Sequence, residues 1–250
     1  METMEVLRSH PLLSQLPDAD LVKLRKRSVI RRWRKGQVVF RKGAPCGGLH
    51  GIISGSIVTV IEADNGKRQT LGAYGPGAYV GVLAAHDGGA CQITAVAREA
   101  SCTLFLPLGE YNSALARVPG SADRIIRLLC NELRNNLRYL ESYVFLDVPV
   151  RLARLILYLQ PRHAGPGEKP PPIGFSQREI ADLLGCSREW VGKELGRWRD
   201  AGIIDIGRRH LVIRDKSALS RIVGTAGGSD RPAVTRLPGL DKNAPRMTAP

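Results

Sequence analysis

The sequence lacks the patterns that would identify a disulfide-bonded protein, a membrane-spanning protein or most enzymes. Five cysteines occur in 250 residues, none of them in a C-x-x-C spacing, so neither a disulfide framework nor a zinc site is indicated. No run approaches 18 apolar residues, and the N-terminus METMEVLRSHPLL has no apolar signal-peptide segment. Five scattered histidines, without a G-x-S-x-G or P-loop motif, provide no candidate catalytic centre. We therefore expect a cytoplasmic protein that is not an enzyme, has no metal site and has no membrane partner.

Positive charge is what the sequence has in excess. Lys and Arg number 37 against 23 Asp and Glu, which gives a formal net charge of +14. Such a balance favours a polyanionic partner, with nucleic acid first and an anionic membrane surface second, although a generally basic proteome would also produce it. Apolar residues make up 43% of the chain and charged residues 24%, as in globular proteins with one large domain or two smaller ones.

The first part of the chain has the rhythm of an antiparallel β-roll. After a basic and mostly helical segment at 5–35, short alternating or β-branched runs follow one another from Gly36 to Leu108. Glycine or proline turns separate these runs, and Asn65-Gly66 is a strong hairpin signal. A short helix is expected at 110–118. We predict a β-roll domain over residues 1–120.

A long amphipathic helix is predicted from Ser121 to Leu146. Its apolar residues recur at spacings of four and three, which is the heptad pattern of a coiled coil. Packing of the helix on its own roll would also bury apolar residues, but a parallel dimer explains so narrow a seam more economically. We predict that residues 121–147 form a dimerisation helix and hinge. The seam consists of Ile126, Cys130, Leu133, Leu137, Leu140 and Val144.

The segment GFSQREIADLLGCSREWVGKELGRWRDAG contains two short helical patterns around a Gly-Cys-Ser turn. Ser176 and Glu179 form a capping box, so the first helix starts at Gln177. Gly185 ends that helix and Ser187 caps the next one. The arrangement is typical of a helix-turn-helix.

The second helix separates a core face from a charged face. Val191, Leu195 and Trp198 fall within a narrow arc and should be buried. Glu189, Gly192, Lys193 and Gly196 lie on another face, and Arg188 can reach over that face from the helix start. Two exposed glycines cost about 1 kcal/mol each relative to alanine, which close approach to another surface would explain. A solvated charged face is the alternative, but DNA binding accounts for more of the pattern.

The rest of the C-terminal third completes this domain and ends in a tail. VPVRLARLILYLQ predicts a helix at 148–160 with Pro149 in the favoured N1 position, followed by a proline-rich connector at 163–172. IIDIGRRHLVIRD predicts two strands around a basic wing at Arg208 and Arg209. We assign a winged helix-turn-helix DNA-binding domain to 148–223 and a disordered basic tail to 224–250, more plausibly a spectator than a further DNA contact.

At this point the chain resembles the cyclic-AMP receptor protein/FNR (Crp/Fnr) superfamily of bacterial transcription regulators. The resemblance covers residues 10–222 and rests on the glycine-punctuated roll, on FLDVPVRLARLIL and on IGFSQREIADLLGCSREWVGKEL. It implies an α+β fold with an N-terminal antiparallel β-roll of the cyclic-nucleotide-binding, jelly-roll type, a long dimerisation helix and a C-terminal winged helix-turn-helix. It also implies a homodimer on a palindromic operator in double-stranded DNA, with RNA polymerase as a further partner.

The resemblance also suggests which bases are read. In the cyclic-AMP receptor branch, an Arg-Glu pair followed four residues later by Arg reads a G-T-G-A type half-site, and the matching residues here are Arg188, Glu189 and Lys193. Lysine keeps the charge but loses bidentate geometry, so we expect a TGTGA-like half-site with one relaxed base. The candidate DNA contacts are Ser176, Gln177, Ser187, Arg188, Glu189, Lys193, Arg208 and Arg209.

The sensor pocket departs from the family pattern. Relatives that bind cyclic nucleotides hold the ribose with the Glu of a Gly-Glu-Leu turn and the phosphate with the Arg of an Arg-Ser or Arg-Thr pair. Val82 and Ile93 stand at the two charged positions, so cyclic AMP is not expected to bind in the usual mode. Asn136 matches a base-contacting position, or sets the register of the coiled coil. The candidate pocket residues are Gly81, Val82, Leu83, Ala84, Gln92, Ile93, Thr94 and Asn136.

The effector and its mechanism stay open at this stage. Haem would need a ligand such as His86, His50 or Cys91, although a lone histidine in a roll loop is more often a surface residue. A redox role for Cys46, Cys91 or Cys102 is disfavoured because strand cysteines are usually buried and inert. An apolar effector, or none, is also consistent with the sequence. The rival functions are a regulatory cyclic-nucleotide module of an enzyme and an architectural protein that binds DNA of any sequence.

Overall fold

The structure is a computed structural model that describes residues 1–62, 68–160, 173–207 and 210–224. The chain forms two compact units, which are described separately. The first contains Met1–Asp64 and Leu71–Glu132, and the second contains Asn65–Thr70 and Leu133–Thr235. The hairpin signal Asn65-Gly66, the connector 163–172, the wing residues Arg208 and Arg209, and most of the tail 224–250 lie outside the described residues.

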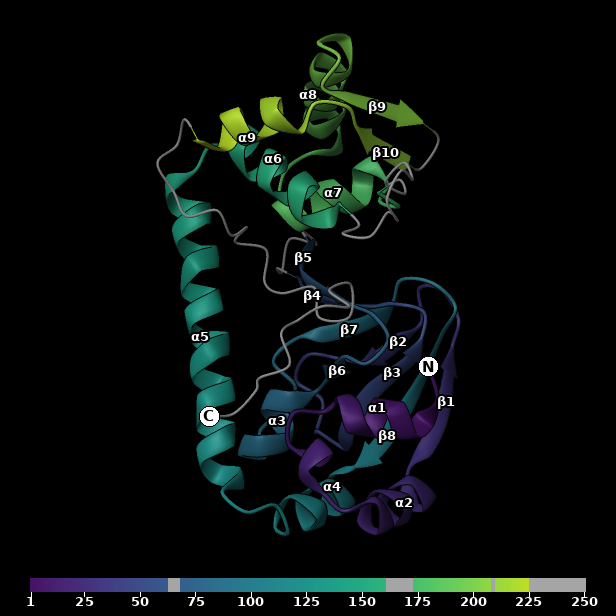
Figure 1. Cartoon of the computed structure of the whole chain (residues 1–250). Coiled ribbons are helices and arrows are strands. Elements are labelled where there is room, and N and C mark those ends of the chain that lie inside the picture. The colour runs from purple at the N-terminus through teal and green to yellow at the C-terminus, as the bar shows by residue number, and fades with distance from the viewer. Residues whose placement is uncertain (63–67, 161–172, 208–209, 225–250) are drawn as a thin grey trace. The chain divides into compact units, whose positions relative to one another are not determined.

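Two four-stranded sheets form the first unit (Figure 1). Their strand orders are β1-β8-β3-β6 and β2-β7-β4-β5, and neighbouring strands run antiparallel in every pair whose register is defined. The predicted antiparallel β-roll is thereby confirmed. The strands are β1 (Val29–Trp33), β2 (Val38–Phe40), β3 (Gly48–Ser54), β4 (Ile57–Glu62), β5 (Arg68–Tyr74), β6 (Tyr79–Val80), β7 (Thr94–Ala97) and β8 (Ser101–Pro107).

Small and β-branched residues form one core of the roll. Ile52 of β3 and Ile57 of β4 are fully buried, and both belong to a cluster with Ala95 and Ala97 of β7. Trp33 packs against this cluster from β1. The alternation expected of a half-buried strand is clearest in β8, whereas the first five residues of β3 are all buried.

The short helices before β1 and after β8 enclose a second core. The fully buried residues Leu7, Leu13, Leu21 and Tyr111 of this core come from α1, η1, α2 and α4. The helix predicted at 110–118 begins two residues earlier, directly after Pro107, whose fixed φ favours a helix start, and it ends three residues earlier, at Leu115. The helices of this unit are α1 (Thr3–Ser9), the 3-10 helix η1 (Leu13–Gln15), α2 (Asp18–Arg27), α3 (Val82–Asp87) and α4 (Leu108–Leu115).

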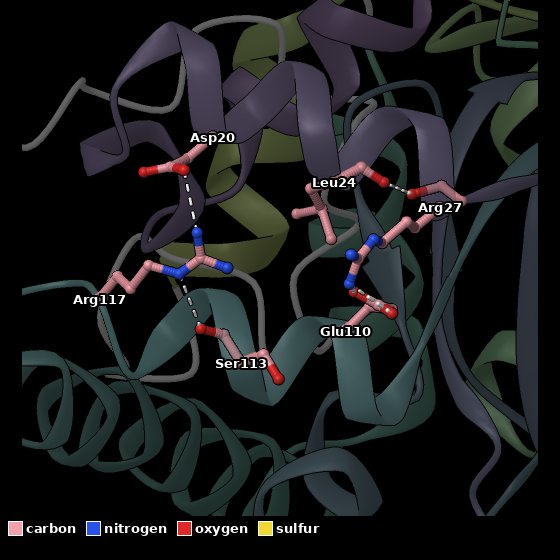
Figure 2. A network of polar contacts seen from close by, with 7 residues as sticks. Asp20, Leu24, Arg27, Glu110, Ser113 and Arg117 are labelled. Carbon is pink, nitrogen blue, oxygen red and sulfur yellow. Dashed lines mark hydrogen bonds and ion pairs between the residues drawn. The ribbon is translucent and has the colours of Figure 1, made fainter.

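Ion pairs join α2 to the region of α4 (Figure 2). Arg117 Nη1 lies 2.9 Å from Asp20 Oδ1, and Arg27 Nη1 lies 2.9 Å from Glu110 Oε2. Both arginine side chains are largely exposed, so each pair contributes about 1 kcal/mol or less. The apolar cluster beneath them is what fixes the two helices on the roll.

A single long helix, α5 (Ser121–Phe145), follows, as the heptad pattern predicts. Ser142 is its only buried residue. Most of its apolar side chains are therefore uncovered in one copy of the chain.

After α5, the described part of the second unit consists of three helices, a hairpin and a last helix (Figure 1). Ile173 forms an isolated antiparallel bridge with Leu211, which ties the chain before α7 to the hairpin. Its core includes Leu152, Ile180, Val191, Leu195 and Leu219. The elements are α6 (Val148–Leu159), α7 (Gln177–Leu184), α8 (Arg188–Asp200), β9 (Ile204–Gly207), β10 (His210–Ile213) and α9 (Lys216–Gly224).

Two details of this unit differ from expectation. Asp147 is the N-cap of α6, so Val148 takes the N1 position and Pro149 is the second helical residue. Proline is tolerated there because its missing N–H would have no intrahelical partner anyway. Helix α9 was not predicted, although Asp215 starts it: its Oδ1 accepts a hydrogen bond from the Ala218 N–H at 2.8 Å.

Candidate nucleic-acid interface

Capping interactions fix the start of α7. The Glu179 N–H donates to Ser176 Oγ at 3.3 Å, and the Ser176 N–H donates to Glu179 Oε2 at 2.9 Å. This is the reciprocal capping box that the sequence predicts. Gly185 ends the helix at φ +68°, in the left-handed region that glycine adopts without strain.

The start of α8 is fixed in the same way. Ser187 Oγ accepts a hydrogen bond from the Trp190 N–H at 3.1 Å. Arg188 is thereby held at the first helical position, directly after a three-residue turn. Helices α7 and α8 pack on each other, which gives the second unit a helix-turn-helix.

Helix α8 presents its charges away from the core. Val191 and Leu195 are at most 1% exposed, whereas Arg188, Glu189 and Lys193 are exposed. None of these three charged residues forms an ion pair within the part of the chain that the structure describes. Their side chains are therefore available to an external partner.

The two glycines of α8 differ in their surroundings. A Cβ on Gly192 would lie 3.1 Å from the Oε1 atom of Gln177, so the absence of a side chain makes room for α7. A Cβ on Gly196 would have no heavy atom within 4 Å. Internal packing therefore accounts in part for Gly192 and does not account for Gly196.

A cleft of about 280 Å³ lies between the start of α7, helix α8 and the β9–β10 hairpin. It brings together Ser176, Gln177 and Arg188 of the predicted contacts, and it adds Arg178 and His210, which the sequence reading missed. His210 pairs with Gly207 across the hairpin. The position of His210 directly after the predicted wing residues could have identified it as a candidate DNA contact. Ser187, Glu189 and Lys193 do not line this cleft.

The predicted effector residues of the first unit surround the start of α3. Gly81 is the N-cap at φ +92°, so the expected turn is the entry to a short helix. Val82 packs against the helical core, whereas the next residue, Leu83, is 57% exposed. Ala84 is buried in the same helix. Charged side chains are thus absent from the whole Gly81–Ala84 stretch.

The second group of predicted effector residues, Gln92, Ile93 and Thr94, also carries no charged side chain. Gln92 is exposed and its amide donates to the Ala90 carbonyl at 3.3 Å. Thr94 Oγ1 accepts from the Lys42 N–H at 3.1 Å, and Ile93 is half-buried. Asn136 belongs to the second unit.

His50 is not the surface residue that a lone histidine in a roll suggests. It is 3% exposed on β3, and its Nδ1 lies 3.2 Å from Thr103 Oγ1. Burial, with the charge of Arg31, lowers the pKa of His50 to about 3, so the ring is neutral at pH 7. Packing and hydrogen bonding thus account for this residue without a ligand.

His86 lies on α3 and is half-buried. Its Nε2 lies 3.3 Å from the hydroxyl of Tyr111, and burial lowers its pKa. No group of three or more His, Cys, Asp or Glu side chains that could hold a metal ion occurs within the described ranges.

The cysteines of the roll are only partly as expected. Cys91 is buried, and burial raises the pKa of its thiol, but Cys46 and Cys102 are half-buried.

None of the described helices is long and apolar enough to cross a membrane.

The predicted dimerisation seam is exposed along α5. Ile126, Leu133, Leu137, Leu140 and Val144 are 56–61% exposed, and Cys130 is exposed as well. An apolar stripe of this length is costly in water. The seam therefore needs a cover that one copy does not supply through its described residues.

Comparisons with known proteins agree with this architecture. Residues 30–118 match the cyclic nucleotide-binding domain family, and residues 150–222 match the Crp-like helix-turn-helix domain family. The chain is 30% identical over 189 residues to a CRP-like cAMP-activated global transcriptional regulator of Mycobacterium tuberculosis, covering 75% of this chain and 84% of that protein.

Two further relatives extend the comparison. The cAMP-activated global transcriptional regulator Vfr of Pseudomonas aeruginosa is 28% identical over 194 residues, which cover 73% of this chain and 88% of Vfr. A solved CRP-family transcriptional regulator from Thermus thermophilus is 26% identical, with a TM-score of 0.63 over 78% of this chain and 97% of that chain. These relatives regulate transcription and are not enzymes, as predicted for this chain. The chain belongs to the Crp/Fnr superfamily of DNA-binding transcription regulators.

Proposed function

We propose that this regulator reads a palindromic operator with TGTGA-like half-sites through Arg188, Glu189 and Lys193. The observation that carries the proposal is their common exposure on α8 without an ion pair among the described residues. The Arg188 guanidinium can donate to both acceptors of a guanine, and Glu189 can accept from a cytosine amino group. Lys193 supplies a point charge, which leaves one base less strictly specified.

Phosphate contacts position this helix. The cleft beside α7 is lined by Gln177 and Arg178, and a DNA backbone crossing it would meet amide and guanidinium donors, whereas the Ser176 hydroxyl already donates to Glu179 Oε2. Ser187 at the start of α8 is a further donor. Arg208 and Arg209 would add two cations at the wing.

The DNA-binding species is a homodimer formed along α5. Two copies of the exposed seam cover each other in a parallel coiled coil, because the spacings of four and three keep the seam facing the partner. The two-fold axis then relates two recognition helices, which enter successive major grooves about 34–36 Å apart. RNA polymerase as a further partner and a cytoplasmic location are inferred from the family alone.

Any effector in the roll is not cyclic AMP in the usual mode. The relatives from Mycobacterium tuberculosis and Pseudomonas aeruginosa are named as cAMP-activated. In this chain, Val82 packs against the apolar core and Ile93 is half-buried, and neither side chain carries the charge that a ribose or a cyclic phosphate requires. An effector that does act must bind the DNA-competent arrangement more tightly than the other.

The test is a comparison of variants on two duplexes, TGTGA-N6-TCACA and a scrambled sequence, at about 150 mM salt. Glu189→Ala should remove most of the preference for the palindrome. Arg197→Ala is the matched control, since Arg197 pairs with Glu194 elsewhere on α8 and should leave the preference unchanged. If the native protein bound both duplexes equally, the proposal would be replaced by the architectural alternative.

A further inference from the structure

Helix α6 carries a buried arginine without a partner. Arg154 is 7% exposed, yet its Nε and Nη2 atoms have no hydrogen-bond partner among the described residues. These two nitrogens form one edge of the guanidinium, the edge that grips a carboxylate or phosphate with two parallel hydrogen bonds. An entire recognition edge is therefore buried and unused.

A second arginine lies beside it. Arg151 is three residues earlier, so the two side chains are neighbours on the same helix surface. Its guanidinium stacks 4.6 Å from the ring centre of Tyr143, and its Nε also lacks a partner. No carboxylate within the described ranges forms an ion pair with either arginine.

Two neighbouring cations without a counter-ion are costly. A buried charge needs both an opposite charge and hydrogen-bond acceptors, and leaving either out destabilises the folded state. The folded state with these two arginines would be stabilised most by an anion that carries more than one charge and at least three acceptor oxygens. Phosphate has both properties, whereas a single carboxylate satisfies one arginine only.

We propose that Arg151 and Arg154 bind the phosphate group of a small phosphorylated molecule. A small anion suits the site better than a DNA backbone, since the free atoms of Arg154 are buried and a small anion needs a smaller opening of the surrounding side chains than a duplex does. The site also adjoins the DNA-reading machinery: α6 packs on α7, and the charge of Arg151 acts on Cys186 in the helix-turn-helix turn. Bound phosphate would therefore act on the turn that places Arg188.

The experiment follows thermal unfolding of the full-length chain in inorganic phosphate and in sodium chloride of equal ionic strength. Phosphate should raise the melting temperature of the native protein by about 2–4 °C. Arg154→Met should melt higher than the native protein in chloride, because an unpaired buried charge is removed. It should gain nothing specific from phosphate. Arg197→Met, which removes an exposed and paired arginine, is the control and should respond to phosphate as the native protein does.

Two results would overturn the proposal: an equal phosphate response in native and Arg154→Met proteins, or a lower melting temperature of Arg154→Met in chloride. DNA as the source of the phosphate is tested separately, through the salt dependence of DNA binding. The slope of Arg154→Met should equal that of the native protein. A slope smaller by about one would assign the phosphate to the DNA backbone and overturn its assignment to a small molecule. None of these readouts depends on which bases Arg188 and Glu189 contact.

Discussion

The side-chain amide of Gln177 on α7 lies against Gly192 on α8, where a Cβ would come within 3.1 Å of its oxygen. Gly196, one turn further along α8, has no such neighbour. A glycine inside a helix costs about 1 kcal/mol relative to alanine, and packing offsets that cost only at Gly192. Gly196 therefore points to a surface outside the molecule.

Substitution of Gly196 separates stability from DNA binding. Gly196→Ala should stabilise the protein by about 0.5–1 kcal/mol, because the added methyl group meets open space in a helical backbone. It should also weaken operator binding, since the methyl group keeps the helix from approaching the groove. Chemical unfolding and fluorescence anisotropy measure the two effects. A stabilised variant with unchanged operator affinity would remove the functional reason for this glycine.

Lys193 provides a gain-of-specificity test. Lys193→Arg should sharpen discrimination at one base of each half-site, by up to about 1–3 kcal/mol, because arginine offers two parallel donors to guanine where lysine offers a point charge. Binding to a set of single-base operator variants measures this. Uniformly tighter binding to all of them would mean that residue 193 contacts phosphate rather than a base.

Cys130 is a natural cross-linking probe for the proposed dimer. In a parallel, in-register coiled coil the two copies of this exposed seam residue face each other, so mild oxidation should yield a covalent dimer on a non-reducing gel. Cys130→Ser should abolish the product, whereas Cys102→Ser should not. Failure of the native protein to cross-link while it is dimeric by light scattering would indicate another arrangement of the helices.

His50 predicts a pH dependence of stability. Its folded pKa of about 3 lies below the ordinary value of 6.5, so the unfolded chain takes up a proton that the folded chain excludes. The stability linked to neutral His50 is present above pH 6.5 and is lost as the pH falls toward 3, by about 1.4 kcal/mol per pH unit. His10, with a pKa lowered to about 3 by burial, acts in the same direction.

His50→Gln is the variant that isolates this contribution. Glutamine can still hydrogen-bond Thr103 but takes up no proton, so the unfolding free energy should fall less steeply between pH 6 and pH 4 than in the native protein. His10 supplies the slope that remains. Urea unfolding at a series of pH values measures it, and identical slopes for variant and native protein would contradict the assignment.

Local signals in the sequence were sufficient for the helix-turn-helix. The capping hydrogen bonds of both helices join residues that are at most four positions apart, so capping fixes the helix boundaries before any tertiary contact forms. The capping residues are Ser176, Glu179, Gly185 and Ser187. The heptad spacing of α5 is equally local. Charged residues at the start of α8 could be recognised as unsuited to a core for the same reason.

Features that depend on distant contacts could not be read in this way. The burial of His50 follows from its packing among residues such as Trp33 and Phe105, which are far away in the sequence. Arg154 looks like an ordinary charge in an amphipathic helix, and only the packed structure shows that its guanidinium edge is buried and unpartnered. Helix α9 was missed because nine residues are too few to form a stable helix alone, and this one gains stability by packing on α6.

The most direct test of the whole account is a fluorescence-anisotropy titration of native protein with TGTGA-N6-TCACA and with a scrambled duplex, each with and without cyclic AMP, at about 150 mM salt. We predict tight and selective binding to the palindrome that cyclic AMP does not change. Selective binding only in the presence of cyclic AMP would contradict the interpretation of Val82 and Ile93. Equal binding to both duplexes would contradict the roles of Arg188, Glu189 and Lys193.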